Sequence, residues 1–262
     1  MRRERAPIWI AVLATFGAAF FVLPLLGLIV RAPWGDVVRS VTSTDTLQAL
    51  KLSLVASLSS TAVSLVLGVP LAWVYARIDF PGRTVLRALT TLPMVLPPVV
   101  GGIALLLAFG RRGLLGSWLD TTFGITLPFT TAGVVFAETF VAMPFLVLTV
   151  EAGLRSMDRR YEDAARTLGA SRWTVLTRVT LPLIAPSLLA GAVLCWARAL
   201  GEFGATITFA GNFPGVTQTM PLAVYLLLET NNPQGSFILS LILLLVSLVV
   251  LVGLRHRWLG SA

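Results

Sequence analysis

Three ionisable side chains, Glu138, Arg198 and Glu202, lie inside stretches that are otherwise apolar and long enough to cross a membrane. Arg198 and Glu202 are four residues apart, so on a helix they share one face and can pair. A charge near the bilayer centre costs about 2.5–3.5 kcal/mol, and such groups normally face a bundle interior or a water-filled path. The pair is expected either to line or gate a path for an anion, or to fix helix packing together with Glu138.

Small residues and a hydroxyl adjoin this pair. Gly201 precedes Glu202, and Gly204 and Thr206 follow it. Small residues let membrane helices approach closely, and a threonine hydroxyl can satisfy a buried polar group. We therefore include Gly201, Gly204 and Thr206 in the candidate path.

Proline and glycine gather in a second apolar stretch, at Pro97, Pro98, Gly101 and Gly102. These residues should break or kink a helix there. Freed backbone groups are tolerated inside a membrane only when they are buried in protein or face a cavity. Pro97 and Pro98 are interpreted as a hinge beside the path, and a static kink used for packing is the alternative.

The segment 158–182 is the longest polar stretch of the chain, and its first half predicts a short helix. Asp158 can cap the helix start, and Glu162 and Asp163 then lie in the first turn, where carboxylates favour the positive end of the helix dipole. Gly169 can end this helix, because glycine adopts the left-handed conformation at low cost.

The second half of the segment predicts another helix. Ser171 can cap its start, and the helix is expected to run to Leu181 and to be stopped by Pro182. The expected unit is therefore a helix, a glycine turn and a helix at the membrane surface, which is suited to binding another protein.

The spacing within this unit resembles the EAA loop of ABC-importer permeases. Asp163-Ala164-Ala165 is followed after three residues by Gly169, and after nine more by Val179-Thr180-Leu181-Pro182. Asp163 stands where glutamate is usual, and Val179 where isoleucine is common. In that family the loop forms a coupling helix that docks into a cytoplasmic ATPase. The resemblance implies that the coupling residues here are Glu162, Asp163, Ala164, Ala165, Leu168, Gly169, Leu181 and Pro182.

Two further stretches resemble the molybdate and sulfate branch of these permeases. Residues 197–206 look like its fifth-span signature, and residues 92–102 with 109–116 look like the third-span stretch of the molybdate branch. The resemblance implies a type I importer permease of a bacterial or archaeal plasma membrane. It would pair as a homodimer, bind ATPase subunits and receive molybdate or tungstate from an external solute-binding protein. Sulfate or thiosulfate is the alternative cargo.

Composition independently predicts an integral membrane protein. Of the 262 residues, 56% are hydrophobic and 12% are charged, with a mean hydropathy of +0.87. A soluble domain carries about 25% charged residues. The net charge of +8 is interpreted as arginines beside anionic lipid rather than as a nucleic-acid surface. We expect one all-α membrane domain over 1–262.

Six apolar runs can each cross the roughly 30 Å core of a bilayer. They cover about 8–30, 52–76, 88–110, 128–150, 183–209 and 236–254. With the N-terminus inside, fourteen of the twenty Lys and Arg residues fall on the cytoplasmic side. Positive residues prefer that side, so both termini and the 158–182 loop are expected in the cytoplasm.

Several chemistries lack their residues in this sequence. It contains no G-x-x-x-x-G-K-[ST] loop, and Lys51 is its only lysine, so ATP with its Mg²⁺ is expected on a partner ATPase rather than here. No catalytic triad or metal-ligand spacing stands out, and we expect neither enzyme activity nor a metal site. A secondary carrier that uses Glu138, Arg198 and Glu202 as a proton relay is an alternative, but it leaves the 163–182 spacing unexplained. A membrane-embedded enzyme is a further alternative.

Overall fold

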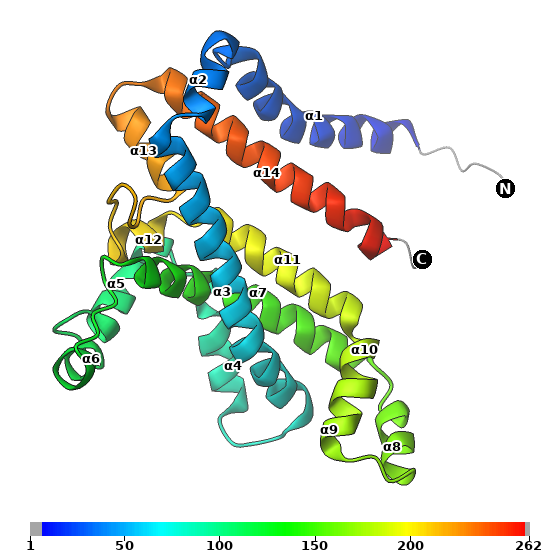
Figure 1. The fold of residues 1–262 in the computed structure, drawn as a ribbon. Coiled ribbons are helices and arrows are strands. Elements are labelled where there is room, and N and C mark those ends of the chain that lie inside the picture. Colours follow the sequence, from blue (N-terminus) through cyan, green and yellow to red (C-terminus); the bar gives the residue numbers. More distant parts are fainter. Residues whose placement is uncertain (1–6, 260–262) are drawn as a thin grey trace.

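A computed structural model describes residues 7–259 and contains helices but no strands within that range (Figure 1). Arg2, Arg3 and Arg5, which contribute to the predicted orientation, lie outside it. The α-helices are α1 (Ile8–Arg31), α2 (Val37–Val41), α3 (Thr44–Arg77), α4 (Arg83–Thr91), α5 (Pro98–Phe109), α6 (Gly116–Phe123), α7 (Thr131–Ser156), α8 (Arg160–Thr167), α9 (Arg172–Val175), α10 (Leu181–Leu183), α11 (Ala185–Leu200), α12 (Gly204–Phe209), α13 (Met220–Glu229) and α14 (Pro233–Leu259). Short 3-10 turns (η1, Trp34–Asp36; η2, Leu92–Met94) and a π-helical segment (η3, Leu176–Thr180) complete the order.

Helices α3, α7 and α11 form the centre of the molecule. Their shared core includes Tyr75, Leu146, Val150 and Cys195, all fully buried. Gly68 of α3 allows the close approach, because a Cβ there would meet Val147 Cγ2 at 3.2 Å. The same face of α3 is lined with small buried residues, as is usual where membrane helices pack closely; they include Ala49, Ser53, Ala56, Ser57, Ser60 and Ser64.

Helix α3 is longer than the predicted second span, which was expected to begin at residue 52. It begins at Thr44, after the Ser43 hydroxyl accepts a hydrogen bond from Thr46 N, and it has 34 residues. At 1.5 Å per residue it is about 51 Å long, which exceeds the hydrocarbon core of a bilayer. The added residues, 44–51, are mostly polar, so a prediction based on hydropathy does not count them as part of the span.

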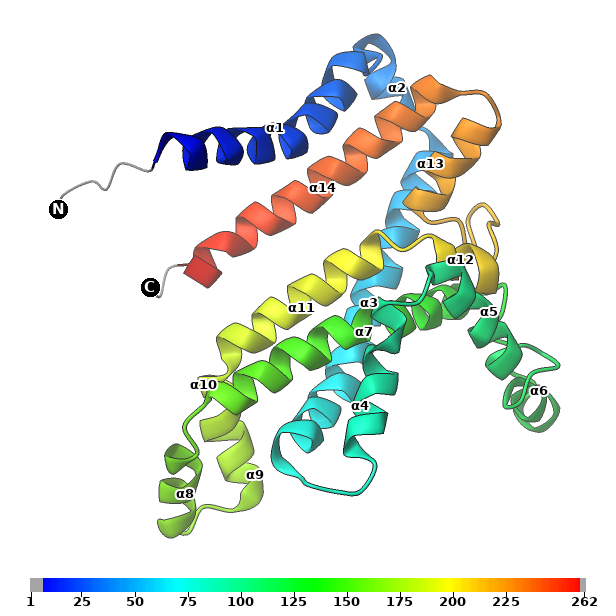
Figure 2. The same ribbon diagram turned by 180° about the vertical axis from the view of Figure 1, so that it is seen from behind.

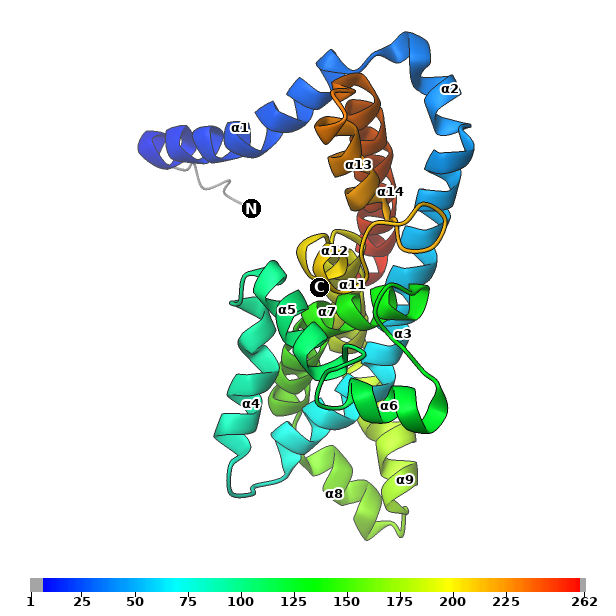
Figure 3. The ribbon, with the colours of Figure 1, turned by 90° about the vertical axis from the view of Figure 1, so that its left-hand side faces the viewer.

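The third apolar run, 88–110, does not form one continuous helix. α4 with η2 and α5 are bent by 119° about a break at residues 95–97 (Figure 3). Pro97 caps α5 and Pro98 begins it, and neither has a backbone N–H to donate. The predicted break is confirmed. The bend is so large that α4 and α5 are separate helices rather than two parts of one kinked helix.

The fifth run, predicted as 183–209, is also divided. α11 ends at Leu200 and α12 begins at Gly204. At the other end, α11 is bent by 72° from the helix of residues 172–183. Pro182 does not stop that helix, contrary to the prediction. The π-helical turns of η3 precede it, and the helix continues to Leu183.

The remaining long helices lie at the periphery. α1 has no buried residue and lies apart from the central bundle, with α14 on its inner side (Figures 1 and 2). A short helix, α13, lies between α12 and α14 in the chain. Within residues 7–259, four helices are long and apolar enough to cross a membrane, or up to six if each bent pair counts as one span.

Candidate functional site

The Arg198–Glu202 pair lies where the fifth run breaks. Arg198 Nη2 lies 2.6 Å from Glu202 Oε2, and the N–H of Ala205 donates a hydrogen bond of 2.8 Å to Glu202 Oε1. The Oε2 contact is an ion pair, because its atoms are not aligned as a hydrogen bond. The Glu202 side chain is 1% exposed and that of Arg198 is 28% exposed. The predicted pairing is therefore confirmed, and the carboxylate holds the two halves of the broken helix together.

Glycine contacts bring the third-run break against the fifth-run break. A Cβ on Gly102 of α5 would lie 2.6 Å from Thr208 Cβ and 2.9 Å from the Ala205 carbonyl oxygen. A Cβ on Gly204 of α12 would lie 2.8 Å from Pro98 Cβ. These two positions accept only glycine without displacement of a neighbouring helix. The two interrupted helices, α5 and α12, thus meet within a few residues of the ion pair.

The other candidate path residues differ in their surroundings. Glu138 on α7 is 1% exposed and Thr206 is fully buried. Glu138 Oε2 and Thr206 Oγ1 have no hydrogen-bond partner among residues 7–259. In the same range, no ion pair or hydrogen bond joins Glu138 to Arg198 or Glu202. Among the candidate path residues, Pro97, Pro98 and Gly201 are exposed.

The 158–182 segment folds as a helical hairpin at one end of the molecule (Figure 1). Gly169 has φ of +85°, and Ser171 Oγ accepts from Thr174 N, so the glycine turn and the second predicted cap are confirmed. At the first helix the N-cap is Arg159, one residue later than predicted, although Asp158 Oδ1 accepts from Arg160 N. Positive φ is the conformation that favours glycine. Leu168, before the turn, is 88% exposed.

The hairpin residues divide into a buried member and an exposed set. Glu162 is 4% exposed; its Oε1 accepts from Thr180 Oγ1 at 2.7 Å and from Arg77 Nη2 at 3.3 Å. This carboxylate fastens α8 to η3 and to the end of α3. Ala165 and Leu181 are half-buried, and the exposed positions are Asp163, Ala164, Leu168, Gly169 and Pro182.

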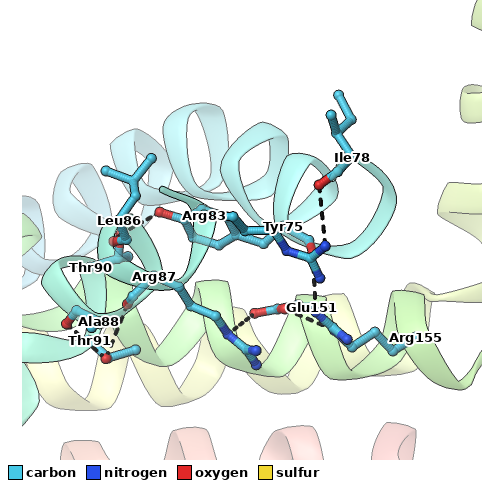
Figure 4. Close-up of polar contacts among 10 residues, drawn as sticks. All are labelled: Tyr75, Ile78, Arg83, Leu86, Arg87, Ala88, Thr90, Thr91, Glu151 and Arg155. Carbon is cyan, nitrogen blue, oxygen red and sulfur yellow. Dashed lines mark hydrogen bonds and ion pairs between the residues drawn. The ribbon is translucent and has the colours of Figure 1, made fainter. Parts of the chain in front are cut away.

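Glu151, to which the sequence assigns no role, is the centre of a second buried ion-pair cluster (Figure 4). Its side chain is 1% exposed, with Arg87 Nε 3.0 Å from Oε2 and Arg155 Nη2 2.9 Å from Oε1. Arg155 also donates to the Tyr75 carbonyl oxygen at 3.2 Å. The cluster joins α4, α7 and α3. The four-residue spacing of Glu151 and Arg155 could be read from the sequence. The contact between Glu151 and Arg87 could not, because it depends on how α4 packs against α7.

The arrangement brings together an ion pair, hydroxyl groups and two closely packed helix breaks. No group of three or more His, Cys, Asp or Glu able to hold a metal occurs in the described part of the chain. The titratable groups at the breaks are tied to one another, and the surrounding groups are glycine, proline and hydroxyls. Such a site can neutralise or guide an anion through a path between helices.

Long apolar helices, two broken helices beside a buried ion pair and a polar helical hairpin are together typical of the membrane-embedded subunits of transporters. The chain belongs to the family of binding-protein-dependent transport system inner membrane components, whose model matches residues 64–259. It is a multi-pass membrane protein and a transport subunit rather than an enzyme.

Curated relatives share much of the sequence. The molybdenum transport system permease protein ModB of Mycobacterium tuberculosis is 47% identical over 253 residues, which cover 96% of this chain and 94% of that protein. ModB of Escherichia coli is 44% identical over 207 residues, covering 78% and 90%. The sulfate transport system permease protein CysT of Escherichia coli is 37% identical over 232 residues, covering 87% and 83%.

Solved structures show the same fold. A bacterial ABC transporter involved in the import of the acidic polysaccharide alginate superposes with a TM-score of 0.75 at 19% identity, over 97% of this chain and 96% of that chain. The all-helical arrangement is therefore that of an ABC-importer permease.

Proposed function

We propose that this chain is the translocation subunit of an ATP-driven importer that brings molybdate, or the closely similar tungstate, into the cytoplasm. The observation that carries the proposal is 47% identity to a molybdenum permease over 96% of the chain. Identity to the sulfate permease CysT is lower, at 37%. Sulfate or thiosulfate is the second candidate cargo, because that relative covers 87% of the chain.

The proposed topology has six spans with both termini in the cytoplasm. The count reaches six if each bent helix pair is one span, and the bent pairs are then the third and fifth spans. The arginines of the hairpin favour the cytoplasmic side. The membrane is the plasma membrane of a bacterium or archaeon.

The hairpin is the proposed coupling element, and ATP with Mg²⁺ is bound by separate ATPase subunits. Asp163, Ala164, Leu168 and Gly169 present the exposed surface that an ATPase would contact, with Ala165, Leu181 and Pro182 supporting it. Glu162 acts within the chain, because its carboxylate is buried against Arg77 and Thr180. A rigid hairpin transmits movement of the ATPase to α3 and α11 instead of bending.

The proposed assembly contains two copies of this chain, two ATPase subunits and an external solute-binding protein. Six spans are few for a complete path, and α1 has no buried residue within the chain. A second copy would close the path and cover apolar surface. Lipid surrounds the remainder, and nucleic acid has no part in the assembly.

The proposed mechanism is alternating access beside the meeting point of α5 and α12. Arg198, with Glu202, Gly201, Gly204, Thr206, Pro97, Pro98 and Glu138, lines or supports the path. Glu202 neutralises Arg198 in the absence of cargo, so the site attracts an oxyanion without holding it tightly, which favours release. A proton relay through Glu138 is less well supported, because within residues 7–259 no hydrogen bond or ion pair joins Glu138 to Arg198 or Glu202.

The test is uptake of labelled molybdate in cells that lack this chain and are complemented with it, with excess sulfate as competitor. We expect uptake that depends on the chain and on a functional partner ATPase and that resists sulfate. Uptake abolished by sulfate would move the cargo to sulfate, and uptake without any ATPase would overturn the importer assignment.

A further inference from the structure

A cavity of about 660 Å³ lies between the end of α3 and the coupling hairpin. Its volume falls in the range of about 300–1,000 Å³ typical of ligand sites. The lining is mainly apolar and comes from six elements, α3, α7, α8, α9, η3 and α10. Its apolar residues include Val69 and Trp73 on α3, Leu154 on α7, Leu176 on η3, Leu181 on α10 and, between α10 and α11, Ile184. An apolar cavity of this size takes a hydrocarbon chain more readily than a polar solute.

The charges at this cavity favour an anion at its mouth. Glu162 is the acidic residue of the lining, and it is neutralised by Arg77 at 3.3 Å. Arg166 and Arg172 also line the cavity, and Arg166 pairs with Asp163 at 3.3 Å. Arg172 is exposed and forms no ion pair within residues 7–259. The mouth therefore presents one free guanidinium and one that is partly neutralised.

The position of the cavity supplies the third argument. It lies beside the last turns of α3, which ends at Arg77, and it includes Trp73 and Trp173. Tryptophan is enriched at the level of lipid headgroups. Basic pockets between membrane helices on the cytoplasmic side bind anionic headgroups. This step rests on the proposed function, because it takes the hairpin as cytoplasmic.

We propose that the cavity binds an anionic phospholipid of the inner leaflet. One acyl chain would occupy the apolar lining, and the phosphate would lie against Arg172 with Arg166 beside it. The lipid would then contact both α3 and the second helix of the coupling hairpin, so its presence would stiffen the joint between the membrane helices and the ATPase-binding surface.

The test is native mass spectrometry of the detergent-purified full-length chain titrated with dioleoylphosphatidylglycerol, with dioleoylphosphatidylcholine as the uncharged comparison. We expect preferential retention of one phosphatidylglycerol per chain. Arg172→Ala should weaken that binding about fivefold, the factor that one arginine near an anionic surface contributes. Arg178→Ala is the matched control, because Arg178 is an exposed arginine on the same helical stretch but outside the cavity lining.

A second variant tests the interior. Val69→Trp should fill the cavity and reduce phosphatidylglycerol retention without removing a charge. Equal retention of the two lipids, or equal loss in Arg172→Ala and Arg178→Ala, would overturn the lipid site. Retention unchanged in both Arg172→Ala and Val69→Trp would do the same.

The failure of this inference is separable from the failure of the proposed function. Labelling of an Arg178→Cys variant from the outside of intact cells would place the hairpin outside and remove the proposed topology. Labelling from the inside only, together with no preference for phosphatidylglycerol, would leave the importer proposal intact and overturn the lipid site alone.

Discussion

Each carboxylate oxygen of Glu202 has its own partner. Oε1 accepts from the Ala205 N–H at 2.8 Å, and Oε2 lies 2.6 Å from Arg198. Because the side chain is 1% exposed, the loss of Arg198 would leave a carboxylate in apolar surroundings with one hydrogen bond. Removing one member of a buried pair usually costs more than removing both.

Arg198→Ala is therefore expected to lower the free energy of unfolding by about 3 kcal/mol and to reduce transport. The loss of folded protein is measured by size-exclusion chromatography after graded heating, and transport by molybdate uptake. Arg112→Ala is the control, because Arg112 is exposed and pairs with no described residue.

The double variant Arg198→Ala/Glu202→Gln separates structure from transport. It removes both charges, so folded yield should return toward that of the parent while uptake stays low. Recovery of both folded yield and uptake would show that Arg198 serves packing alone.

At the scale of elements, α5 and α12 are in close contact because glycine occupies both sides. Gly102→Ala should push α12 away, since its Cβ would lie 2.9 Å from a backbone oxygen that cannot rotate aside. Overpacking of this kind costs about 1–3 kcal/mol. We expect lower thermal stability and reduced uptake.

The neighbouring Gly101→Ala is a matched control for this pair. Its Cβ would meet only the Phe140 ring edge, at 3.2 Å, and that side chain can shift. Similar losses in the two variants, measured in the same heating and uptake assays, would mean that helix propensity rather than the α5–α12 contact sets the effect.

The coupling hairpin is a second element whose geometry depends on one glycine. Gly169 has φ of +85°, whereas proline is restricted to about −65°. Gly169→Pro is expected to abolish uptake and ATPase co-purification while membrane insertion continues, and a bulky charge at the half-buried Ala165 should act in the same direction. Gly124→Pro is the control, because Gly124 also has positive φ, 65°, but ends α6 far from the hairpin in sequence. Normal ATPase co-purification in Gly169→Pro would contradict the docking role.

At the scale of the whole molecule, the exposed apolar surface of α1 and the small number of spans predict a pair of chains. Native mass spectrometry of the purified chain should give twice the mass of 28.1 kDa in a detergent that preserves transport on reconstitution. Because Cys195 is the only cysteine and is buried, an engineered surface cysteine would report crosslinks between copies without background. A single-copy mass at all concentrations would contradict the homodimer.

Local sequence patterns predict the parts of this molecule that depend on neighbouring residues. The Ser171 cap, the Gly169 turn, the proline break before α5 and the spacing of Arg198 and Glu202 all follow from residues within a few positions of one another. Contacts between residues far apart in the chain could not be predicted from these local patterns. Glu151 with Arg87, Glu162 with Arg77, and Gly102 with Thr208 join residues far apart in the chain, and each depends on how two helices pack rather than on their periodicity. Hydropathy likewise locates apolar runs but not breaks inside them, which is why the break between α11 and α12 in the fifth run was not predicted.

The Glu151 cluster also bears on how the third run would move. At one end, Arg87 ties α4 to α7, and at the other, Gly102 and Gly204 hold α5 against α12. Between these two attachments lie residues 95–97 and a bend of 119°. Any change in the angle between the attachments is therefore taken up by the backbone torsions of three residues, one of which is a proline with a fixed φ. The fixed φ of the proline limits the directions in which α4 and α5 can rotate relative to one another.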